Sequence, residues 1–232
     1  MADTKDVEDI FRLSPNQEAL LLHRLQHQSR DAGLLQVSAT LAGRLDDGAF
    51  REAWQRTLER HPLLRASVHW ESVRHPVQVI SKNASLPVHF KDWRKRSKND
   101  QERLFADLVE NDRRKGVDLG KAPAMRVNVV RTARRESRVL WTCHHILLDG
   151  WSSGLVLDEV VRRYNGIGGD GKYQPEASQP AKYREYVNWV RNQDESAART
   201  FWKAQEIPPC QPLARTVPQV HATASTTVRL DG

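Results

Sequence analysis

The sequence predicts an α/β sandwich that forms a single lobe. Segments rich in β-branched and aromatic residues, as in strands, alternate with segments whose apolar residues recur at helical spacing. Two of the strand segments are close enough in the sequence to form a hairpin, and a chain of 232 residues can bury one sizeable core or two small ones. No apolar stretch approaches the roughly 18 to 20 residues that a membrane span needs.

The composition is typical of a soluble globular protein, with 39% hydrophobic and 28% charged residues. The N-terminus does not resemble a signal peptide. The two cysteines, Cys143 and Cys210, are too few and too far apart for a disulfide framework. We therefore expect a cytoplasmic protein.

The net charge of +7 raises the question of nucleic-acid binding. Basic residues cluster at 91–98 and 131–138, but acidic residues are interspersed, and neither run carries the series of interleaved aromatic residues of a single-strand binding platform. These runs favour a solvated face. We expect neither nucleic acid nor a membrane as a partner.

In the N-terminal part, a helix is expected to start at Ser14, with Pro15 at its first position and Glu18 near its positive end. Strands are expected at 34–41 and, after Pro62, at 64–70. Between them, a helix carries an apolar stripe that predicts core residues at Phe50, Ala53, Trp54, Thr57 and Leu58.

The middle of the chain is predicted to contain short strands at 77–80 and 88–90, followed by a helix at 101–114. The residues that this helix should turn inward are Leu104, Phe105, Leu108 and Val109. Segments 125–130 and 139–144 then make a hairpin across the charged residues between them.

A further helix is predicted from Ser152 onward, and its inward face should consist of Leu157, Val160, Val161 and Tyr164. The glycine-rich segment 166–171 indicates a loop, and it is no phosphate loop because no Gly-Lys-Ser/Thr follows.

Two helices should complete the C-terminal part. The first, at 180–190, carries a stripe of Tyr183, Tyr186, Val187 and Val190, and the second, shorter helix holds Ala198, Phe201 and Trp202. Beyond it, a linker should end in a strand at 226–230. We thus predict one unit over 1–207 and a linker with a strand over 208–232.

The segment from Cys143 to Ser152 is where we expect chemistry. Its two histidines lie at the end of a strand, where alternation places His144 and His145 on opposite faces, so they cannot do the same job. A neutral imidazole suits general-base work. A purely structural pair of histidines is the alternative. Zinc is not expected, because nothing near Cys143 and His145 completes a set of three or four ligands.

Asp149 and Gly150 follow the histidines across a predicted turn from strand to helix. Asp149 could pair with an arginine and hold the loop in place. Gly150 would allow a sharp turn or the close approach of a substrate.

The string from His144 to Ser152 resembles the HHxxxDGxS signature of condensation domains of nonribosomal peptide synthetases, within the chloramphenicol-acetyltransferase-like superfamily. Three other segments resemble motifs of this family, in the family's order. They are Asp-Ile-Phe-x-Leu-Ser-Pro-x-Gln-Glu at 9–18, the RHxxLRxxF-like segment at 60–68 with Val68 in place of the aromatic residue, and Tyr-x-x-Tyr-x-x-Trp at 183–189.

The resemblance implies a chloramphenicol-acetyltransferase-like α/β sandwich. A complete condensation domain has two similar lobes, and its later motifs do not follow here. The chain is therefore similar to the N-terminal lobe alone, half of a pseudo-dimeric domain.

The resemblance also implies roles for the site residues. His145 would hydrogen-bond or deprotonate an attacking amine, His144 would support it from the other face, and Gly150 would admit the substrate arm or help the developing oxyanion. Trp151 and Ser152 are expected to contact the substrate.

In the family, the arginine that matches Arg60 is expected to pair with the aspartate of the main motif, here Asp149, and so to hold the loop. Arg65 would give further support. No metal and no bound cofactor are required, because the substrates ride on the phosphopantetheine arms of carrier proteins.

The implied reaction is amide-bond formation between a carrier-bound donor thioester and a carrier-bound aminoacyl acceptor. The expected partners are the upstream donor and downstream acceptor carrier proteins, which could dock on a basic surface, and the missing C-terminal lobe. The opening motif resembles the subclass that takes a D-configured donor. Its place near the chain start indicates an upstream synthetase subunit docking near the N-terminus.

Two other functions remain open. One is a related acyltransferase with the same HHxxxDG motif and an alcohol acceptor. The other is a non-catalytic or epimerization-type lobe that serves for docking. We expect the isolated lobe to be inactive or weakly active, because half of the active-site tunnel is missing.

Overall fold

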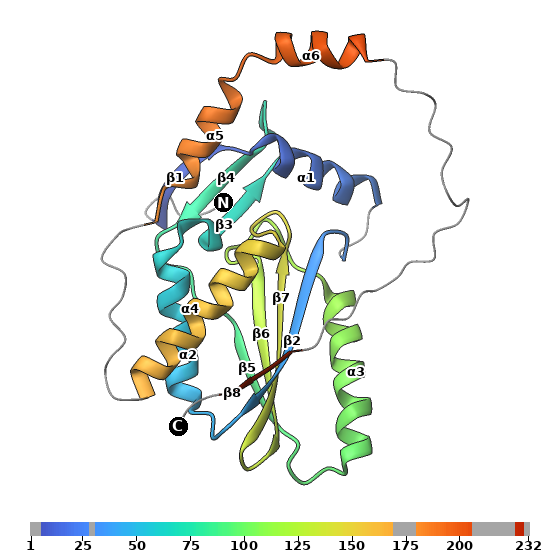
Figure 1. Cartoon of the computed structure of the whole chain (residues 1–232), viewed down its shortest axis with the longest axis vertical. Coiled ribbons are helices and arrows are strands. Elements are labelled where there is room, and N and C mark those ends of the chain that lie inside the picture. Colours follow the sequence, from blue (N-terminus) through green and yellow to red (C-terminus); the bar gives the residue numbers. More distant parts are fainter. Residues whose placement is uncertain (1–5, 28–30, 169–179, 206–225, 230–232) are drawn as a thin grey trace, which may run out of the picture.

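The computed structural model describes residues 6–27, 31–168, 180–205 and 226–229. These residues form helices and two β-sheets, so the predicted α/β class is confirmed. In Figure 1 the smaller sheet, with α1 and α5 beside it, lies above the larger sheet, which carries α2 and α4 on one side.

The smaller sheet has the strand order β1-β4-β3 and is antiparallel. Its strands are β1 (Val7–Arg12), β3 (Ala66–His69) and β4 (Val77–Ser81). Strand β1 was not expected, because its segment mixes charged with apolar residues and pairing with β4 decides its conformation. The strand expected at 64–70 is shorter, because Pro62 begins a 3₁₀ turn, η2 (Pro62–Arg65).

The larger sheet has the order β5-β6-β7-β2-β8. Its strands are β2 (Leu34–Ala42), β5 (Val88–Asp92), β6 (Met125–Ala133), β7 (Glu136–His144) and β8 (Thr226–Arg229). The predicted hairpin is confirmed as β6 and β7, and β2 runs antiparallel to β7, with Leu34 opposite His144. The first residue of β2 therefore lies beside the first histidine of the motif.

Strand β8 pairs in parallel with β2 at the edge of this sheet. The strand expected near 226–230 is thus present, and it extends the sheet of this unit. The predicted linker falls at 208–225, which lies outside the described residues. The division at residue 207 stays a prediction.

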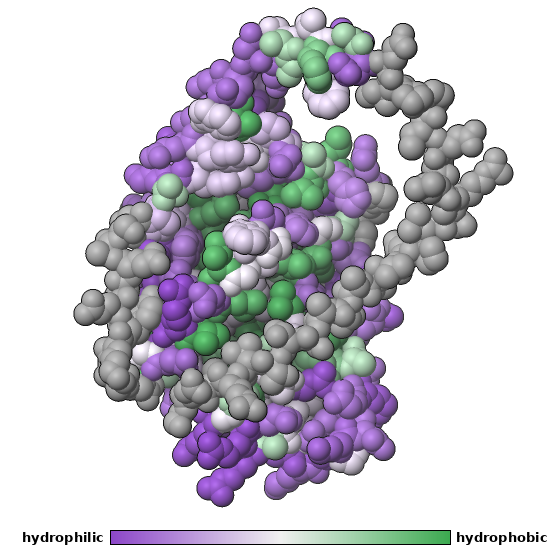
Figure 2. Space-filling model, in the orientation of Figure 1, coloured by the Kyte–Doolittle hydropathy of each residue, from purple (hydrophilic) through white to green (hydrophobic). Residues whose placement is uncertain are grey.

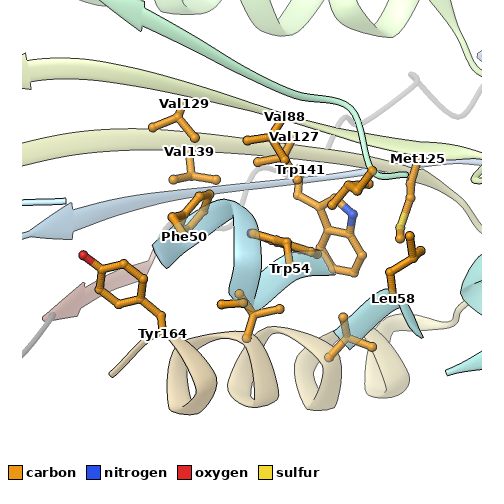
Figure 3. Close-up of a cluster of buried hydrophobic side chains, with 14 of the residues drawn as sticks. Phe50, Trp54, Leu58, Val88, Met125, Val127, Val129, Val139, Trp141 and Tyr164 are labelled. Atoms are coloured by element: carbon orange, nitrogen blue, oxygen red, sulfur yellow. The ribbon is translucent and has the colours of Figure 1, made fainter. Parts of the chain in front are cut away.

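Two helices, α2 (Asp47–Arg60) and α4 (Gly150–Gly168), cover one face of the larger sheet (Figure 1). All five core residues predicted for α2 are buried. Figure 3 shows how Trp54 of α2 meets Trp141 of β7, with ring centroids 5.2 Å apart. Burial of a large apolar side chain stabilises a fold by about 2 to 3 kcal/mol. This core holds β7 and α4, the two elements that flank the motif.

The other face of the larger sheet packs against α3 (Lys98–Lys115). Of the predicted inward residues, Phe105 is buried, and Leu108 and Val109 are partly buried against the same cluster. The alternation of apolar and polar residues in the sequence did not predict the buried polar residues on this face of the sheet. Asp112 of α3 is buried and forms an ion pair of 2.6 Å with Arg126 of β6.

A second core lies between the two sheets, where α1 (Pro15–His27) begins at the predicted proline. It includes Ile146 and Leu147, which directly follow the histidines. The C-terminal helices are α5 (Tyr183–Arg191) and α6 (Glu195–Ala204). Val187 of α5 is buried, whereas α6 buries no residue.

The expected inward face of α4 is partly confirmed: Val160 and Tyr164 are buried, and Leu157 is only half-buried. The helix continues to Gly168, past the start of the predicted glycine loop, and the rest of that loop lies outside the described residues. Among the described helices, none is long and apolar enough to span a bilayer.

Candidate active site

The motif forms the connection between β7, which ends at His144, and α4, which begins at Gly150. The predicted turn from strand to helix is therefore confirmed. Cys143 before the turn belongs to the core beneath α2 and α4, while Ile146 and Leu147 within it belong to the core between the sheets. The turn is thus anchored on both sides, which limits the freedom of the residues that it presents.

His144 is fully buried, with 0% of its surface exposed. Its Nε2 lies 3.0 Å from the carbonyl oxygen of Ala32, and its Nδ1 accepts a hydrogen bond of 3.0 Å from the amide of Ile146. A carbonyl only accepts, so the proton is on Nε2 and the ring is neutral. Burial and the positive charge of Arg24 lower the pKa of His144 to about 4. Both nitrogens are occupied, in keeping with a supporting role.

The segment Ala32–Gly33, which sequence reasoning missed, holds both histidines. The Gly33 carbonyl accepts a hydrogen bond of 2.8 Å from the amide of His145. Gly33 has a φ of +78°, and a Cβ atom there would lie 2.8 Å from two atoms of the His144 ring. Only glycine suits this position. In the sequence, the feature that could have indicated this segment is a glycine just before a predicted strand.

The side chain of His145 is half-buried, and among the described residues its imidazole has no hydrogen-bond partner. The two histidines therefore have different surroundings, as expected from their places on opposite faces of the strand. His144 is locked in the core, while the imidazole of His145 is available to a reacting group. Cys143, next to them, is a fully buried core residue, and its burial raises the pKa of its thiol to about 12.

Asp149 is exposed, and its carboxylate accepts a hydrogen bond of 2.7 Å from the amide of Ser152. It therefore caps the first turn of α4. This hydrogen bond lowers the pKa of Asp149, with a smaller contribution from His145. The expected pair of Asp149 with Arg60 is wrong, since Arg60 Nε lies 3.6 Å from Glu159 instead.

The carboxylate of Glu159, in the middle of α4, interacts with three basic side chains. His61 Nε2 lies 2.7 Å and Arg163 Nη2 lies 2.6 Å from its carboxylate, in addition to Arg60. Burial opposes the charge of Glu159, but hydrogen bonds from His61 and Arg163 outweigh it and lower its pKa to about 2. Arg60 and His61 end α2 where it packs on α4, so they join the two helices and do not reach the turn itself.

Arg65 does not support the active-site loop either. It is 5% exposed and contacts Glu8 of β1 at 2.6 Å and the carbonyl of Glu59 at 3.3 Å, and it also donates to the carbonyl of Ser81. Because it lies at the end of η2, beside β1 and β4, it stabilises the smaller sheet.

Gly150 is exposed, and a Cβ atom on it would meet nothing within 4 Å. Its φ is not positive, so the turn does not require glycine at this position. The open space around it is compatible with the expected approach of a substrate.

Trp151 is 82% exposed, whereas Ser152 is half-buried and donates its amide to the cap. Leu155, one turn after Trp151, is 58% exposed. Figure 2 shows hydrophobic residues in the middle of the face where Figure 1 places α4. The N-terminal half of α4 thus presents an apolar surface next to the turn.

The basic runs at 91–98 and 131–138 lie at the end of the larger sheet that is opposite the turn with the histidines. Arg94, Arg131 and Arg134 line a cavity of about 380 Å³ beside Asp46 and Asp47. Arg131 pairs with Asp47 at 2.6 Å, so acidic residues offset part of the charge. Among the described residues, no group of three or more His, Cys, Asp or Glu side chains could hold a metal ion.

The structure combines two β-sheets and their helices with a turn that presents one buried and one available histidine. This arrangement is a chloramphenicol-acetyltransferase-like α/β sandwich of one lobe. Solved structures share this fold. The starter condensation domain of the rhizomide synthetase RzmA matches with a TM-score of 0.73 at 17% identity, covering 88% of this chain and 52% of that one. A four-domain nonribosomal peptide synthetase bound to AMP and glycine matches with a TM-score of 0.68 at 21% identity, over 85% of this chain and 15% of that one.

The family follows from the sequence comparisons. A model of the condensation domain matches residues 7–231, and the chain belongs to this family. One of the linear gramicidin synthase proteins of Brevibacillus parabrevis is 36% identical over 203 residues, which cover 87% of this chain and 4% of that protein. Bacitracin synthase 3 of Bacillus licheniformis is 32% identical over 198 residues, covering 85% of this chain and 3% of that protein. The chain thus spans only a few per cent of the length of these relatives.

Proposed function

We propose that the chain is the N-terminal lobe of a condensation domain and that the complete domain forms an amide bond between two carrier-bound substrates. The observation that carries this proposal is the pair of histidines. A neutral, fully hydrogen-bonded His144 lies behind His145, whose imidazole has no hydrogen-bond partner among the described residues.

In the proposed reaction, the amine of an aminoacyl acceptor attacks the carbonyl carbon of a donor thioester. The new C–N bond forms, the C–S bond breaks, and the donor phosphopantetheine leaves as a thiol. His145 accepts the proton of the attacking amine or orients that amine, and the proton ends on the departing sulfur. Asp149 caps α4 and keeps the turn in place, while the open side of Gly150 admits the phosphopantetheine arm.

The apolar surface of α4 and α5 supports the proposal of a second lobe. Trp151 and Leu155 of α4 and Trp189 of α5 are 58% to 82% exposed, although aromatic and aliphatic side chains of this size usually pack against other groups. The match to about half of the starter condensation domain is in keeping with this. The lobe extends over 1–207, and 208–232 leads toward the C-terminal lobe.

The partners follow from the reaction. They are an upstream donor carrier protein and a downstream acceptor carrier protein, and the chain itself binds no cofactor. The opening motif at 9–18 supports a D-configured donor. The site of action is the cytoplasm.

The test is a longer chain from the same parent that includes the C-terminal lobe. It is assayed with two loaded carrier proteins, a D- or an L-configured donor, and His145→Ala as the comparison. We expect a dipeptide with the D-donor and none with the variant. Transfer to an alcohol acceptor alone would favour the acyltransferase, and carrier binding without any product would favour a docking lobe. Robust condensation by the 232-residue chain alone would contradict the need for a second lobe.

A further inference from the structure

Gln17 is a buried glutamine at the start of α1, and its side chain reaches the turn that carries the histidines. It is 3% exposed, and its Nε2 donates a hydrogen bond of 2.9 Å to the carbonyl of Ile146. The two residues lie 129 positions apart in the sequence. Side-chain contacts from α1 to this turn were not expected from the sequence.

Every hydrogen-bonding position of the Gln17 amide is used. Its Oε1 accepts from the amide of Ser14 at 2.9 Å and from Nε2 of Gln78 at 2.9 Å. Its Nε2 donates to Oε1 of Gln78 at 3.3 Å in addition to Ile146. A primary amide offers two donors and two acceptor sites, so this side chain is fully satisfied and its orientation is determined.

The peptide groups that Gln17 helps to hold directly follow His145. The amide of Ile146 donates to Nδ1 of His144 and its carbonyl accepts from Gln17, so a side chain of β7 and a side chain of the distant α1 bind its two polar groups. On the other side, the amide of His145 is bound to Gly33. The backbone is therefore held before and after the imidazole of His145.

The contact also links the sequence motifs to one another. Ser14, whose hydroxyl accepts from the amide of Gln17, in turn accepts a hydrogen bond of 3.2 Å from the hydroxyl of Tyr183 in α5. The motif at 9–18 and the motif at 183–189 thus contact each other at Ser14, and Gln17 of the first motif binds the turn.

We propose that Gln17 is a positioning residue that fixes the backbone of the turn and thereby the direction of the His145 imidazole. This inference rests on the proposed role of His145. Gln17 touches no reacting atom and acts only through Ile146. Loss of its donor should free the carbonyl of Ile146, allow the peptide after Ile146 to rotate, and thereby change the surroundings of both histidine rings.

The test uses Gln17→Met, which keeps the length of the side chain and removes its hydrogen bonds. The matched control is Gln101→Met in α3, because Gln101 is also buried and donates to carbonyls away from the turn, those of Trp93 and Thr132 at 3.0 Å. The readouts are the ¹⁵N and ¹H resonances of the His144 and His145 rings and the exchange rate of the Ile146 amide, all in the 232-residue chain.

We expect Gln17→Met to shift both ring signals and to raise the exchange rate of the Ile146 amide by at least about tenfold. Gln101→Met should leave these signals in place even if it destabilises the chain as much. Unchanged signals in Gln17→Met, or equal changes in the two variants, would overturn the proposal.

Gln17→Glu provides a second variant if Gln17→Met does not fold. Its carboxyl group has the same shape, and when protonated it retains one donor for the Ile146 carbonyl. The turn signals should therefore resemble those of the wild type at acidic pH and depart from them as the carboxyl ionises. A spectrum that stays native at every pH would contradict the inference. These readouts need no catalysis, so a failure of the condensation assay and a failure of this inference remain distinguishable.

Discussion

The Nε2 atom of His144 donates to the carbonyl oxygen of Ala32 at 3.0 Å, while its Nδ1 accepts a hydrogen bond from the amide of Ile146. A protonated ring would carry a second N–H and could not accept that bond. The first histidine of the motif is thus stable only as a neutral ring, and this has a measurable consequence for the pH dependence of stability.

Stability should fall as the pH decreases from 6.5 to 4. The pKa of His144 is lowered from the ordinary 6.5 to about 4 by burial, so in this range the unfolded chain binds a proton that the folded chain does not. The loss should be about 2 kcal/mol at pH 4.5 and should approach about 3 kcal/mol near pH 4. Urea unfolding at pH 7 and pH 4.5 measures this loss of stability. The variant His144→Ala removes the imidazole, so its free energy of unfolding should depend less on pH. An equal pH dependence in the variant would contradict this explanation.

Gly33→Ala should destabilise the chain by about 1 to 3 kcal/mol. The residue has a φ of +78°, and the added Cβ would lie 2.8 Å from the ring of His144. Gly154→Ala in α4 is the control, because its Cβ would meet nothing within 4 Å and alanine favours a helix. Thermal unfolding of both variants makes the comparison. Equal stability of the two would show that the turn tolerates the clash.

Glu159→Gln should cost about 3 kcal/mol, because the carboxylate is 13% exposed and balances Arg60, His61 and Arg163. The exposed Glu52, which pairs with Arg56 on the surface of α2, is the control, and Glu52→Gln should cost no more than about 0.5 kcal/mol. Urea unfolding of the two variants measures both costs, and equal losses would contradict the role of Glu159.

The same measurement distinguishes the partners of Arg60. A double-mutant cycle between Arg60 and Glu159 should give a coupling energy above about 0.5 kcal/mol, whereas a cycle between Arg60 and Asp149 should give none beyond error. A large coupling with Asp149 would restore the pair that the motif led us to expect.

His145→Ala should leave stability within about 1 kcal/mol, because the side chain is half-buried and holds no hydrogen bond to the described residues. In a complete domain the same change should lower the rate of condensation by about 10² to 10⁴, the contribution of a positioned base. Chemical denaturation and single-turnover kinetics measure the two effects. A variant that loses several kcal/mol of stability but keeps the rate of condensation would contradict the role that we assign to His145.

The sequence alone was sufficient for most helices and strands and for the family. The stripe from Phe50 to Leu58 and the hairpin before His144 could be read from periodicity, because burial on one face leaves an alternating or helical pattern. The place of the candidate site could be proposed for the same reason, since a polar motif at the end of an apolar strand stands out.

Only the tertiary structure decided which side chains meet there. Arg60 pairs with Glu159 because α2 crosses the middle of α4, and no spacing in the sequence encodes that crossing. Strand β1 exists because β4 offers it a partner, not because its residues favour a strand. Gln17, Ala32 and Gly33 lie more than 100 positions before the turn that they hold, so only the packing of α1 and β2 against it shows their role.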